Sequence, residues 1–413
     1  MDNPDKAPLV ICGHGMVAQR LLENLVAGGH PYHRIVVFNA EPFNAYNRVR
    51  LSSLLAGEIE EPELELKPWQ WYRKNRIEVC NHEPVVTIHP GQQQVVTASG
   101  RTEVYRKLVL ATGSRPSRLG IPGEDLEGVL YFRDLADTRT LISHAGKYRH
   151  AVVIGGGFLG LEAAEGLRAR GMAVTVLHRG EYLLNRQLDA SAGALLEHKL
   201  QQRGLETLTG TAPVALLGQG RVSAVRLSDG TVITTDLVVI ATGITPDCEL
   251  AATAGLSCDR GILVDAHLLT SDPHIHALGE CCQHGEHTFG LVEPGYLQAD
   301  ILARCLGQAT RSRGFAPGQT ATRLKISGLP IFSCGQIEPG PATEVIRWQD
   351  RAHHTYGRLL IERNRLIGAV LLGDTSNGPW YGELINRGTD ISDYRDTLAF
   401  GKSYSNAAAL TAA

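Results

Sequence analysis

The stretch AVVIGGGFLGLEAAEGL, residues 151–167, decides the fold of this chain. Residues 151–154 are apolar and predict a short buried strand, which runs into a glycine-rich turn and then an alanine- and leucine-rich helix. The turn is a GxGxxG motif formed by Gly155, Gly157 and Gly160. In such a unit the first glycine permits the turn, the second lets the backbone approach a pyrophosphate, and the third allows close helix packing. We therefore expect these glycines to bind a dinucleotide at the helix N-terminus.

A second unit of the same kind lies near the start of the chain. Residues 9–12 (LVIC) predict a buried strand, and Gly13, Gly15 and Ala18 occupy the three motif positions before another helical pattern. Alanine is tolerated at the third position because a methyl group still lets the helix and strand come close. The chain is therefore expected to carry two dinucleotide-binding folds.

Two matching segments bracket the central unit. Residues 108–116 (LVLATGSRP) and 237–246 (LVVIATGITP) each read as an apolar strand, then Ala-Thr-Gly, then proline. This layout predicts one nucleotide domain inserted into another. We place the outer domain at residues 1–117 and 245–319, and the inserted domain at 118–244.

The character of the sequence changes near residue 320. Residues 355–373 (TYGRLLIERNRLIGAVLLG) predict two strands joined by a polar turn. We expect a C-terminal α+β domain with an antiparallel sheet at 320–405, and a frayed tail at 406–413. The predicted fold class is α/β, with two Rossmann-like dinucleotide-binding domains, one inserted in the other, plus this C-terminal domain.

Composition excludes several classes of function. The 413 residues are 43% hydrophobic and 20% charged, as in ordinary globular proteins, and a net charge of −3 argues against a nucleic-acid partner. The N-terminus is polar and no run of about 18 apolar residues occurs, so we expect a cytoplasmic protein without a membrane partner. The eight cysteines are scattered and lack the spacing of iron–sulfur ligands, so an organic cofactor would carry any electrons.

These motifs resemble the two-dinucleotide flavoprotein reductases, the superfamily of glutathione reductase and the ferredoxin reductases. Within it, residues 41–53, 186–189 and 279–281 are most similar to two proteins of nitrogen assimilation. One is the FAD/NADH module that begins the large subunit of assimilatory nitrite reductase. The other is the electron-transfer subunit of assimilatory nitrate reductase, which the length favours, because the chain ends where the nitrite reductase would continue into iron–sulfur and siroheme domains.

The resemblance implies FAD on the first glycine turn. Arg48 would pair with its pyrophosphate, and a surface arginine is the alternative. Glu41, after the strand predicted at 34–38, is the candidate for the ribose hydroxyls, and a solvated loop carboxylate is the alternative. Glu280 stands where the superfamily more often has aspartate, which leaves its detailed contacts open. The expected FAD residues are Gly13, Gly15, Ala18, Glu41, Arg48, Gly279 and Glu280. Further cofactor-binding candidates lie in the two Ala-Thr-Gly segments: Ala111, Thr112, Gly113 and Gly243.

The resemblance implies a nicotinamide nucleotide on the second turn, held by Gly155, Gly157 and Gly160. Glu162 matches a superfamily glutamate close to the flavin and nicotinamide and is the catalytic candidate, although acidic residues are favoured near helix N-termini in any case. His178 and Arg179 follow the next strand as further cofactor-binding candidates. Their basic character favours NADPH, whereas the resemblance favours NADH. We favour NADH and leave NADPH open.

Electrons would leave directly from the flavin. Related thiol enzymes carry a cysteine where this chain has Ser53, and a hydroxyl cannot form a disulfide or a sulfenic acid. We expect an FAD-dependent NAD(P)H oxidoreductase whose partner carries an iron–sulfur or other one-electron centre, with the catalytic subunit of assimilatory nitrate reductase preferred. The alternatives are a rubredoxin or ferredoxin reductase, an NADH oxidase, and, from another class, a flavoprotein redox sensor or interaction module.

The segment Cys281-Cys282-Gln283-His284-Gly285-Glu286-His287 holds two thiols and two imidazoles. Adjacent cysteines lack ordinary zinc-ligand spacing, so no metal site is expected. A redox-active thiol is the second alternative, and a structural role is preferred.

Overall fold

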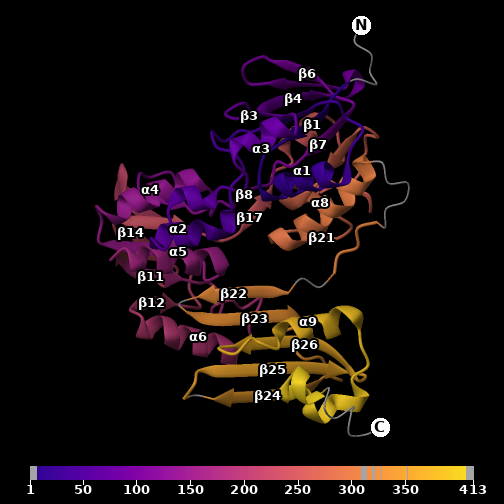
Figure 1. Ribbon diagram of the computed structural model, residues 1–413. Coiled ribbons are helices and arrows are strands. Elements are labelled where there is room, and N and C mark those ends of the chain that lie inside the picture. Colours follow the sequence, from indigo (N-terminus) through magenta and orange to yellow (C-terminus); the bar gives the residue numbers. More distant parts are fainter. Residues whose placement is uncertain (1–6, 308–313, 319–320, 327, 351, 406–413) are drawn as a thin grey trace. The chain divides into compact units, whose positions relative to one another are not determined.

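The computed structural model describes residues 7–307, 314–318, 321–326, 328–350 and 352–405 (Figure 1). The tail expected at 406–413 lies outside the described residues. The chain divides into two compact units. The first takes the described parts of Met1–Leu51, Ile59–Ser117 and Gly243–Pro317, and the second takes those of Ser52–Glu58, Arg118–Thr242 and Gly318–Ala413.

The first unit is built on a parallel sheet of five strands in the order β19-β7-β1-β2-β3. Its strands are β1 (Leu9–Cys12), β2 (Ile35–Phe38), β3 (Ile77–Cys80), β7 (Lys107–Leu110) and β19 (Ile275–Ala277). Helices α1 (Met16–Gly28) and α8 (Val292–Leu306) lie side by side (Figure 1). The residues of β1 and β2 are buried throughout, as expected for parallel strands covered on both faces.

Smaller elements complete the first unit. They are the sheet β4 (Val85–His89), β5 (Gln94–Thr97) and β6 (Thr102–Val104); the pair β8 (Ser114–Pro116) and β17 (Ile244–Pro246); the sheet β18 (Ile262–Leu263), β20 (Cys282–His284) and β21 (His287–Thr288); helices α3 (Trp69–Lys74) and α7 (Glu249–Thr253); and the 3-10 turns η2 (Arg48–Arg50), η3 (Glu61–Leu64), η4 (Pro90–Gln92) and η5 (Gly279–Cys281).

The second unit begins with another parallel five-stranded sheet, in the order β12-β11-β10-β16-β9. Its strands are β9 (Val129–Tyr131), β10 (His150–Ile154), β11 (Ala173–Leu177), β12 (Leu205–Leu208) and β16 (Leu237–Ile240). Its helices are α4 (Leu135–Ala145), α5 (Phe158–Ala169) and α6 (Ala190–Gln202), and an antiparallel sheet is formed by β13 (Pro213–Gln219), β14 (Arg221–Leu227) and β15 (Val232–Thr234).

Helix α2 (Leu51–Ala56) packs most of its length on the second unit. A methyl group added at Gly166 of α5 would come within 2.6 Å of the Leu55 side chain, so the two helices touch closely. The Arg170 guanidinium donates hydrogen bonds to the carbonyls of Leu54 and Leu55. A glycine and an arginine of the inserted domain thus anchor a short segment from much earlier in the chain.

The C-terminal part of the second unit is an antiparallel sheet in the order β22-β23-β26-β25-β24. Its elements are β22 (Thr322–Ile326), β23 (Leu329–Gly335), β24 (Glu344–Asp350), β25 (Thr355–Glu362), β26 (Arg365–Leu372), α9 (Gly378–Arg387) and η6 (Ser392–Phe400). Arg363 and Asn364 adopt positive φ at the turn between β25 and β26. Helix α9 packs on β23 and β26 (Figure 1). Two parallel Rossmann-like sheets and an antiparallel C-terminal sheet confirm the predicted fold class.

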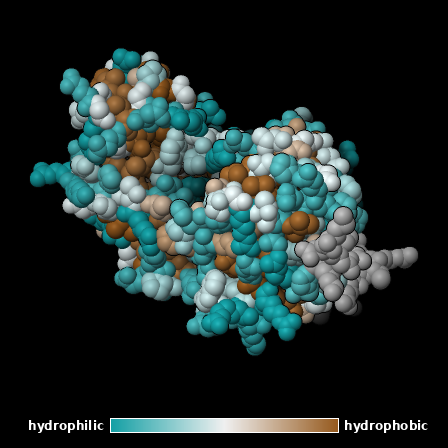
Figure 2. All heavy atoms as spheres, turned by 90° about the horizontal axis from the view of Figure 1, so that it is seen from above, coloured by the Kyte–Doolittle hydropathy of each residue, from teal (hydrophilic) through white to brown (hydrophobic). Residues whose placement is uncertain are grey.

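The surface is mainly polar on the face drawn in Figure 2, where hydrophobic residues gather in a few groups among hydrophilic ones. Among the described residues, no helix is long and apolar enough to cross a bilayer. Charged and polar groups therefore make up most of the surface that this face offers to a partner.

Candidate functional site

The first glycine loop joins β1 to α1. Gly13 has φ +103°, and a Cβ placed there would lie 2.2 Å from the carbonyl oxygen of Ala111, so glycine is required. Gly15 precedes α1, and within the described part of the chain no heavy atom lies within 4 Å of a Cβ built there. The N-cap residue of α1 is this glycine, which has no side chain to cap the first N–H groups of the helix.

The second loop, between β10 and α5, repeats this geometry. Gly155 has φ +131°, and its Cβ would lie 2.2 Å from the carbonyl oxygen of Ala241. Gly157 occupies the place of Gly15, with φ −87° and ψ −173° against −86° and −173°. A Cβ at Gly160 would meet the carbonyl oxygen of Gly155 at 1.8 Å. The two glycine turns predicted from the sequence therefore have the same backbone conformation.

These two loops fit the diphosphate of a dinucleotide. Each presents the N-terminus of a helix, where aligned peptide dipoles favour an anion, and each leaves open space at its middle glycine. FAD would be held by the loop of the first unit and the nicotinamide nucleotide by the loop of the second. The assignment of individual residues to these cofactors stays a prediction.

The residues that end the two Ala-Thr-Gly segments meet within the first unit. Strands β8 and β17 pair antiparallel, the Thr112 hydroxyl donates to the carbonyl oxygen of Asp247 at 2.6 Å, and Asp247 N–H donates to Gly113 at 2.9 Å. The glycines that end the two segments, Gly113 and Gly243, have φ values of +73° and +138°. The chain thus leaves and re-enters the first unit at neighbouring points.

Gly279 and Glu280 lie close to the first of these segments. Gly279 has φ +84° and its N–H donates to the buried Gln298 side chain at 2.7 Å. The Glu280 carboxylate accepts a hydrogen bond from the Ser114 hydroxyl at 2.7 Å. The glutamate that departs from the superfamily pattern is therefore fixed by the residue that follows Ala-Thr-Gly.

Glu41 and Arg48 form an ion pair, and Tyr46 donates its hydroxyl hydrogen to the Glu41 carboxylate at 2.8 Å. The Arg48 guanidinium also lies over the Tyr46 ring, 5.2 Å from its centroid. The two charged residues expected to contact different parts of FAD are thus neighbours of one another. The contacts with Arg48 and Tyr46 fix the Glu41 carboxylate just after the end of β2.

His178 and Arg179 are placed differently at the end of β11. His178 turns into the glycine loop: its Nδ1 accepts the Gly156 N–H at 3.2 Å and its Nε2 lies 3.3 Å from Asn185 Oδ1. Burial lowers the pKa of His178, which favours the neutral imidazole. Arg179 is exposed. Of this basic pair, Arg179 is therefore the residue suited to meet a ribose or a 2′-phosphate.

Glu162 lies on α5, one turn beyond the glycine loop. Burial raises the pKa of this carboxyl to about 7. A carboxyl with such a pKa can hold or release a proton near neutral pH, as catalytic groups do. The expected catalytic role is consistent with this property and stays a prediction.

His14 is a residue of the first loop that the sequence analysis passed over. It is buried, its Nε2 lies 3.3 Å from Gln19 Oε1, and Tyr72 donates its hydroxyl hydrogen to the same oxygen at 2.7 Å. Burial lowers the pKa of His14 to about 4, so the ring is neutral. Its position between Gly13 and Gly15 was the only sequence signal, and the contact with Tyr72 joins residues far apart in the chain.

Cys281 and Cys282 are fully buried thiols. The Cys281 thiol donates to the carbonyl of Leu278 and that of Cys282 to the carbonyl of Gly279. Burial raises the pKa of both thiols, so neither has the properties of a reactive cysteine. Within the described residues no group of three or more candidate ligands could hold a metal ion. These features support the structural role.

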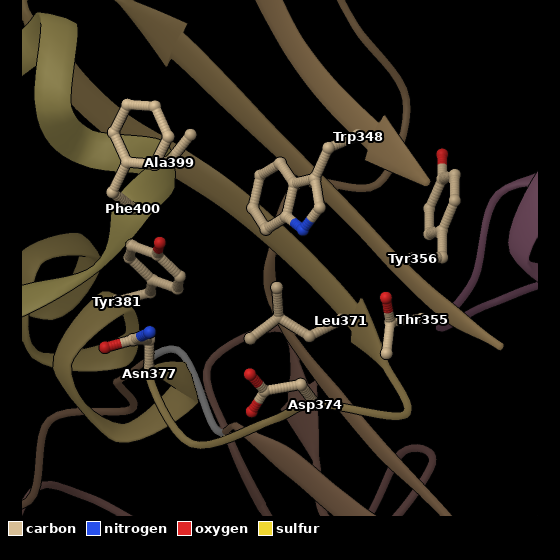
Figure 3. A pocket seen from close by; sticks show the side chains of 9 residues that line it. All are labelled: Trp348, Thr355, Tyr356, Leu371, Asp374, Asn377, Tyr381, Ala399 and Phe400. Carbon is tan, nitrogen blue, oxygen red and sulfur yellow. The ribbon is translucent and has the colours of Figure 1, made fainter. Parts of the chain in front are cut away.

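A separate pocket of about 180 Å³ lies in the C-terminal domain (Figure 3). Trp348 of β24 lies flat on β25, where a Cβ at Gly357 would come within 2.0 Å of its ring. The Asp374 carboxylate, the Asn377 amide and the Tyr381 ring face the hollow from the other side. The full lining is Trp348, Thr355, Tyr356, Leu371, Asp374, Asn377, Tyr381, Ala399 and Phe400. None of these residues was a predicted cofactor contact.

Comparisons with known proteins agree with this architecture. Residues 7–299 match the family model described as pyridine nucleotide-disulphide oxidoreductase, and residues 321–389 match the rubredoxin NAD+ reductase C-terminal domain. Both matches confirm the resemblance inferred from the motifs.

Three relatives are informative. The chain is 39% identical over 388 residues to nitrite reductase [NAD(P)H] of Bacillus subtilis (strain 168), covering 94% of this chain and 48% of that protein. It is 38% identical over 389 residues to the assimilatory nitrate reductase electron transfer subunit of the same organism, covering 94% and 50%. The structure of a covalent putidaredoxin reductase–putidaredoxin complex aligns with a TM-score of 0.87 and 25% identity, covering 98% of each chain.

The chain thus spans about half the length of the curated relatives it matches. This corrects the argument from length. The electron transfer subunit is covered to the same extent as the nitrite reductase, so length does not distinguish them.

Proposed function

We propose that this chain, which belongs to the pyridine nucleotide-disulphide oxidoreductase family, takes a hydride from NADH onto bound FAD and passes the electrons one at a time to a partner metalloprotein. The observation that carries the proposal is the pair of equivalent glycine loops. Each places an uncapped helix N-terminus at the end of a parallel sheet, within the described residues. One loop would hold FAD and the other the nicotinamide nucleotide.

Ser53 supports a direct exit of electrons from the flavin. It lies on α2, and its hydroxyl donates to the Glu58 carboxylate at 2.9 Å. A hydroxyl cannot exchange with a disulfide, so the thiol chemistry of the disulfide reductases has no residue here. The electrons of the flavin would then pass to a one-electron acceptor.

The protein partner we favour is the catalytic subunit of an assimilatory nitrate reductase. The support is the similarity to the electron transfer subunit of that system over 94% of this chain. The nitrite reductase relative is as similar, so a siroheme-type acceptor is the direct competitor. A reductase of a small iron–sulfur protein is a second candidate, supported by the likeness of the whole chain to putidaredoxin reductase.

Reconstitution distinguishes these partners. The purified FAD-loaded protein is mixed in turn with a nitrate reductase catalytic subunit, a siroheme nitrite reductase module, and a rubredoxin or ferredoxin, and NADH consumption is followed without oxygen. We expect NADH-dependent nitrate reduction that saturates with the catalytic subunit. Saturation only with the nitrite reductase module or the small carrier would overturn the preferred partner, while leaving the reductase assignment intact.

NADH is the favoured coenzyme. The support is the resemblance to NADH-dependent reductases. His178 is engaged by Gly156 and Asn185 and its pKa is lowered, so of the basic pair only the exposed Arg179 offers a charge to a 2′-phosphate at neutral pH. The ratio of kcat/KM for NADH and NADPH tests this choice, and a ratio below one would contradict it.

A further inference from the structure

One wall of the C-terminal pocket is an aromatic ring that lies on the antiparallel sheet (Figure 3). Trp348 of β24, Gly357 of β25 and Leu371 of β26 are neighbours in the register of the three strands. A Cβ at Gly357 would lie 2.0 Å from the Trp348 ring, so the indole occupies the space in which a side chain of β25 would stand. Glycine at this position therefore lets the indole lie over the sheet and line the pocket.

The opposite side of the pocket comes from α9 and the end of η6. The Tyr381 hydroxyl donates to the carbonyl oxygen of Leu398 at 2.8 Å, so this polar group is already engaged within the domain. Phe400 also lines the pocket, and 65% of its surface is exposed. The pocket is thus bordered by aromatic rings and is reached from solvent beside Phe400.

Asp374 is the charged residue of this lining. Its Oδ1 accepts the Ser376 N–H at 3.0 Å, and this hydrogen bond lowers the pKa of the carboxyl, so Asp374 is ionised at neutral pH. In the described part of the chain, no cationic side chain lines the pocket and none forms an ion pair with Asp374. A carboxylate and the face of an indole both attract a positive charge.

We propose that this pocket binds a small organic cation, an ammonium or guanidinium group on a short apolar stem. The Asp374 carboxylate would pair with the charge, and the Trp348 ring would attract it and contact the stem. The volume of about 180 Å³ suits such a group, since a cavity of about 150 Å³ in another protein holds benzene. None of the lining residues belongs to either glycine loop, so the site does not depend on the proposed reductase function.

Titration calorimetry of the full-length protein with n-butylammonium tests the proposal. n-Butanol and butyrate are the control ligands, because they carry a neutral and a negative head on a similar short apolar stem. We expect saturable binding of n-butylammonium to a single site, about tenfold or more tighter than the binding of either control. The absence of saturable binding, or equal affinity for n-butylammonium and n-butanol, would overturn the proposal.

Two variants assign the binding to this pocket. Asp374→Asn keeps an oxygen that can accept the Ser376 N–H and removes the charge. Its affinity for n-butylammonium should fall by about tenfold or more. Trp348→Leu keeps an apolar side chain without the π face, and affinity should fall by about fivefold. Wild-type affinity in Asp374→Asn would contradict the proposal.

The matched control variant is Asp390→Asn. The Asp390 carboxylate also accepts an N–H two residues further on, from Ser392 at 2.9 Å, but Asp390 does not line the pocket. This variant should bind n-butylammonium as the wild type does. An equal loss of affinity in Asp390→Asn and Asp374→Asn would show attraction by general surface charge and would overturn the site.

A lysine derivative distinguishes two sources of the same cation. Nα-acetyl-lysine methylamide carries the butylammonium group on a peptide unit. Tighter binding of n-butylammonium would identify a free amine as the ligand, and tighter binding of the lysine derivative would identify a side chain of a partner protein. Both results support the cation site, whereas binding of neither compound would overturn it.

Discussion

At the scale of single residues, the middle glycine of the nucleotide loop separates folding from binding. A Cβ at Gly157 meets no described heavy atom within 4 Å, and the backbone there is extended, so alanine fits the fold. The same Cβ would occupy the space expected for a pyrophosphate. We predict that Gly157→Ala changes the free energy of unfolding by less than about 0.5 kcal/mol and weakens nicotinamide nucleotide binding by roughly tenfold or more.

The matched variant is Gly160→Ala in the same loop. Its Cβ would lie 1.8 Å from the carbonyl oxygen of Gly155, so the loop must move and stability should fall by about 1–3 kcal/mol. Chemical denaturation and nucleotide titration of both proteins measure the contrast. Equal loss of stability in the two variants would contradict the separate roles.

Glu162 gives a pH-dependent prediction. Its pKa is raised by burial from an ordinary value of 4.5 to about 7, so ionisation costs the folded state free energy. The cost begins as the pH rises above about 4.5 and is complete above about 7. Glu162→Gln removes it, and we expect a gain of roughly 1–3 kcal/mol at pH 8 that shrinks toward pH 5.

Urea denaturation at several pH values measures this gain. The control is Glu181→Gln, which removes the same charge from an exposed position and should leave the pH dependence unchanged. A gain for Glu162→Gln that does not vary with pH would show that burial of the charge is not its source.

At the scale of the elements, Asp189 joins α6 to the C-terminal sheet. Its carboxylate caps α6 by accepting the N–H groups of Ser191 and Ala192, at 2.9 and 3.1 Å. It also accepts the Tyr356 hydroxyl hydrogen at 2.9 Å and lies 3.2 Å from the Arg358 guanidinium. Both charged side chains are nearly buried, with 7% and 11% of their surface exposed.

We predict that Asp189→Ala lowers the stability of the second unit by about 3–5 kcal/mol, because it removes a cap and leaves the Arg358 charge buried without its partner. Asp189→Asn keeps an oxygen for the cap but not the charge, and should cost less. Thermal unfolding of the three proteins provides the comparison. Identical melting temperatures for wild type and Asp189→Ala would refute this role.

The same element shows where sequence analysis reaches its limit. The glycine turns were predictable because the motif has a fixed spacing after a short apolar strand, and because Gly13 and Gly155 meet a local requirement for positive φ. The partners of Asp189 were not predictable, since Tyr356 and Arg358 lie far from Asp189 in the sequence, in the C-terminal sheet. The close contact between Leu55 and Gly166 escaped for the same reason, because it depends on how distant segments pack.

The same difference between local motifs and contacts of distant segments is seen at the candidate site. Motif glycines and their order were predicted from spacing, whereas the turning of His178 into the Gly156 N–H depends on the conformation of two loops. His178 and Arg179 are both basic in the sequence, yet in the structure His178 is half-buried and hydrogen-bonded, whereas Arg179 is exposed. The residue type alone does not determine where a side chain points in a loop.

At the scale of the whole molecule, the chain carries two complete nucleotide-binding folds and a C-terminal sheet in two compact units. A chain with only one such loop would bind a single nucleotide. Two loops of the same geometry in one family member are instead what hydride transfer between two bound cofactors needs.

Hydride transfer from NADH to FAD and the release of single electrons are both measured by the rate of NADH oxidation by the purified, FAD-loaded protein with ferricyanide, a one-electron acceptor, and with oxygen. We predict rapid ferricyanide reduction and oxygen consumption that is slower by about a hundredfold, which corresponds to a difference of about 3 kcal/mol in barrier height. Ser53→Ala should turn over ferricyanide at the wild-type rate, because no step passes through that residue. Rapid oxygen consumption would identify an oxidase instead, and slow turnover with both acceptors would contradict a reductase and favour a redox sensor.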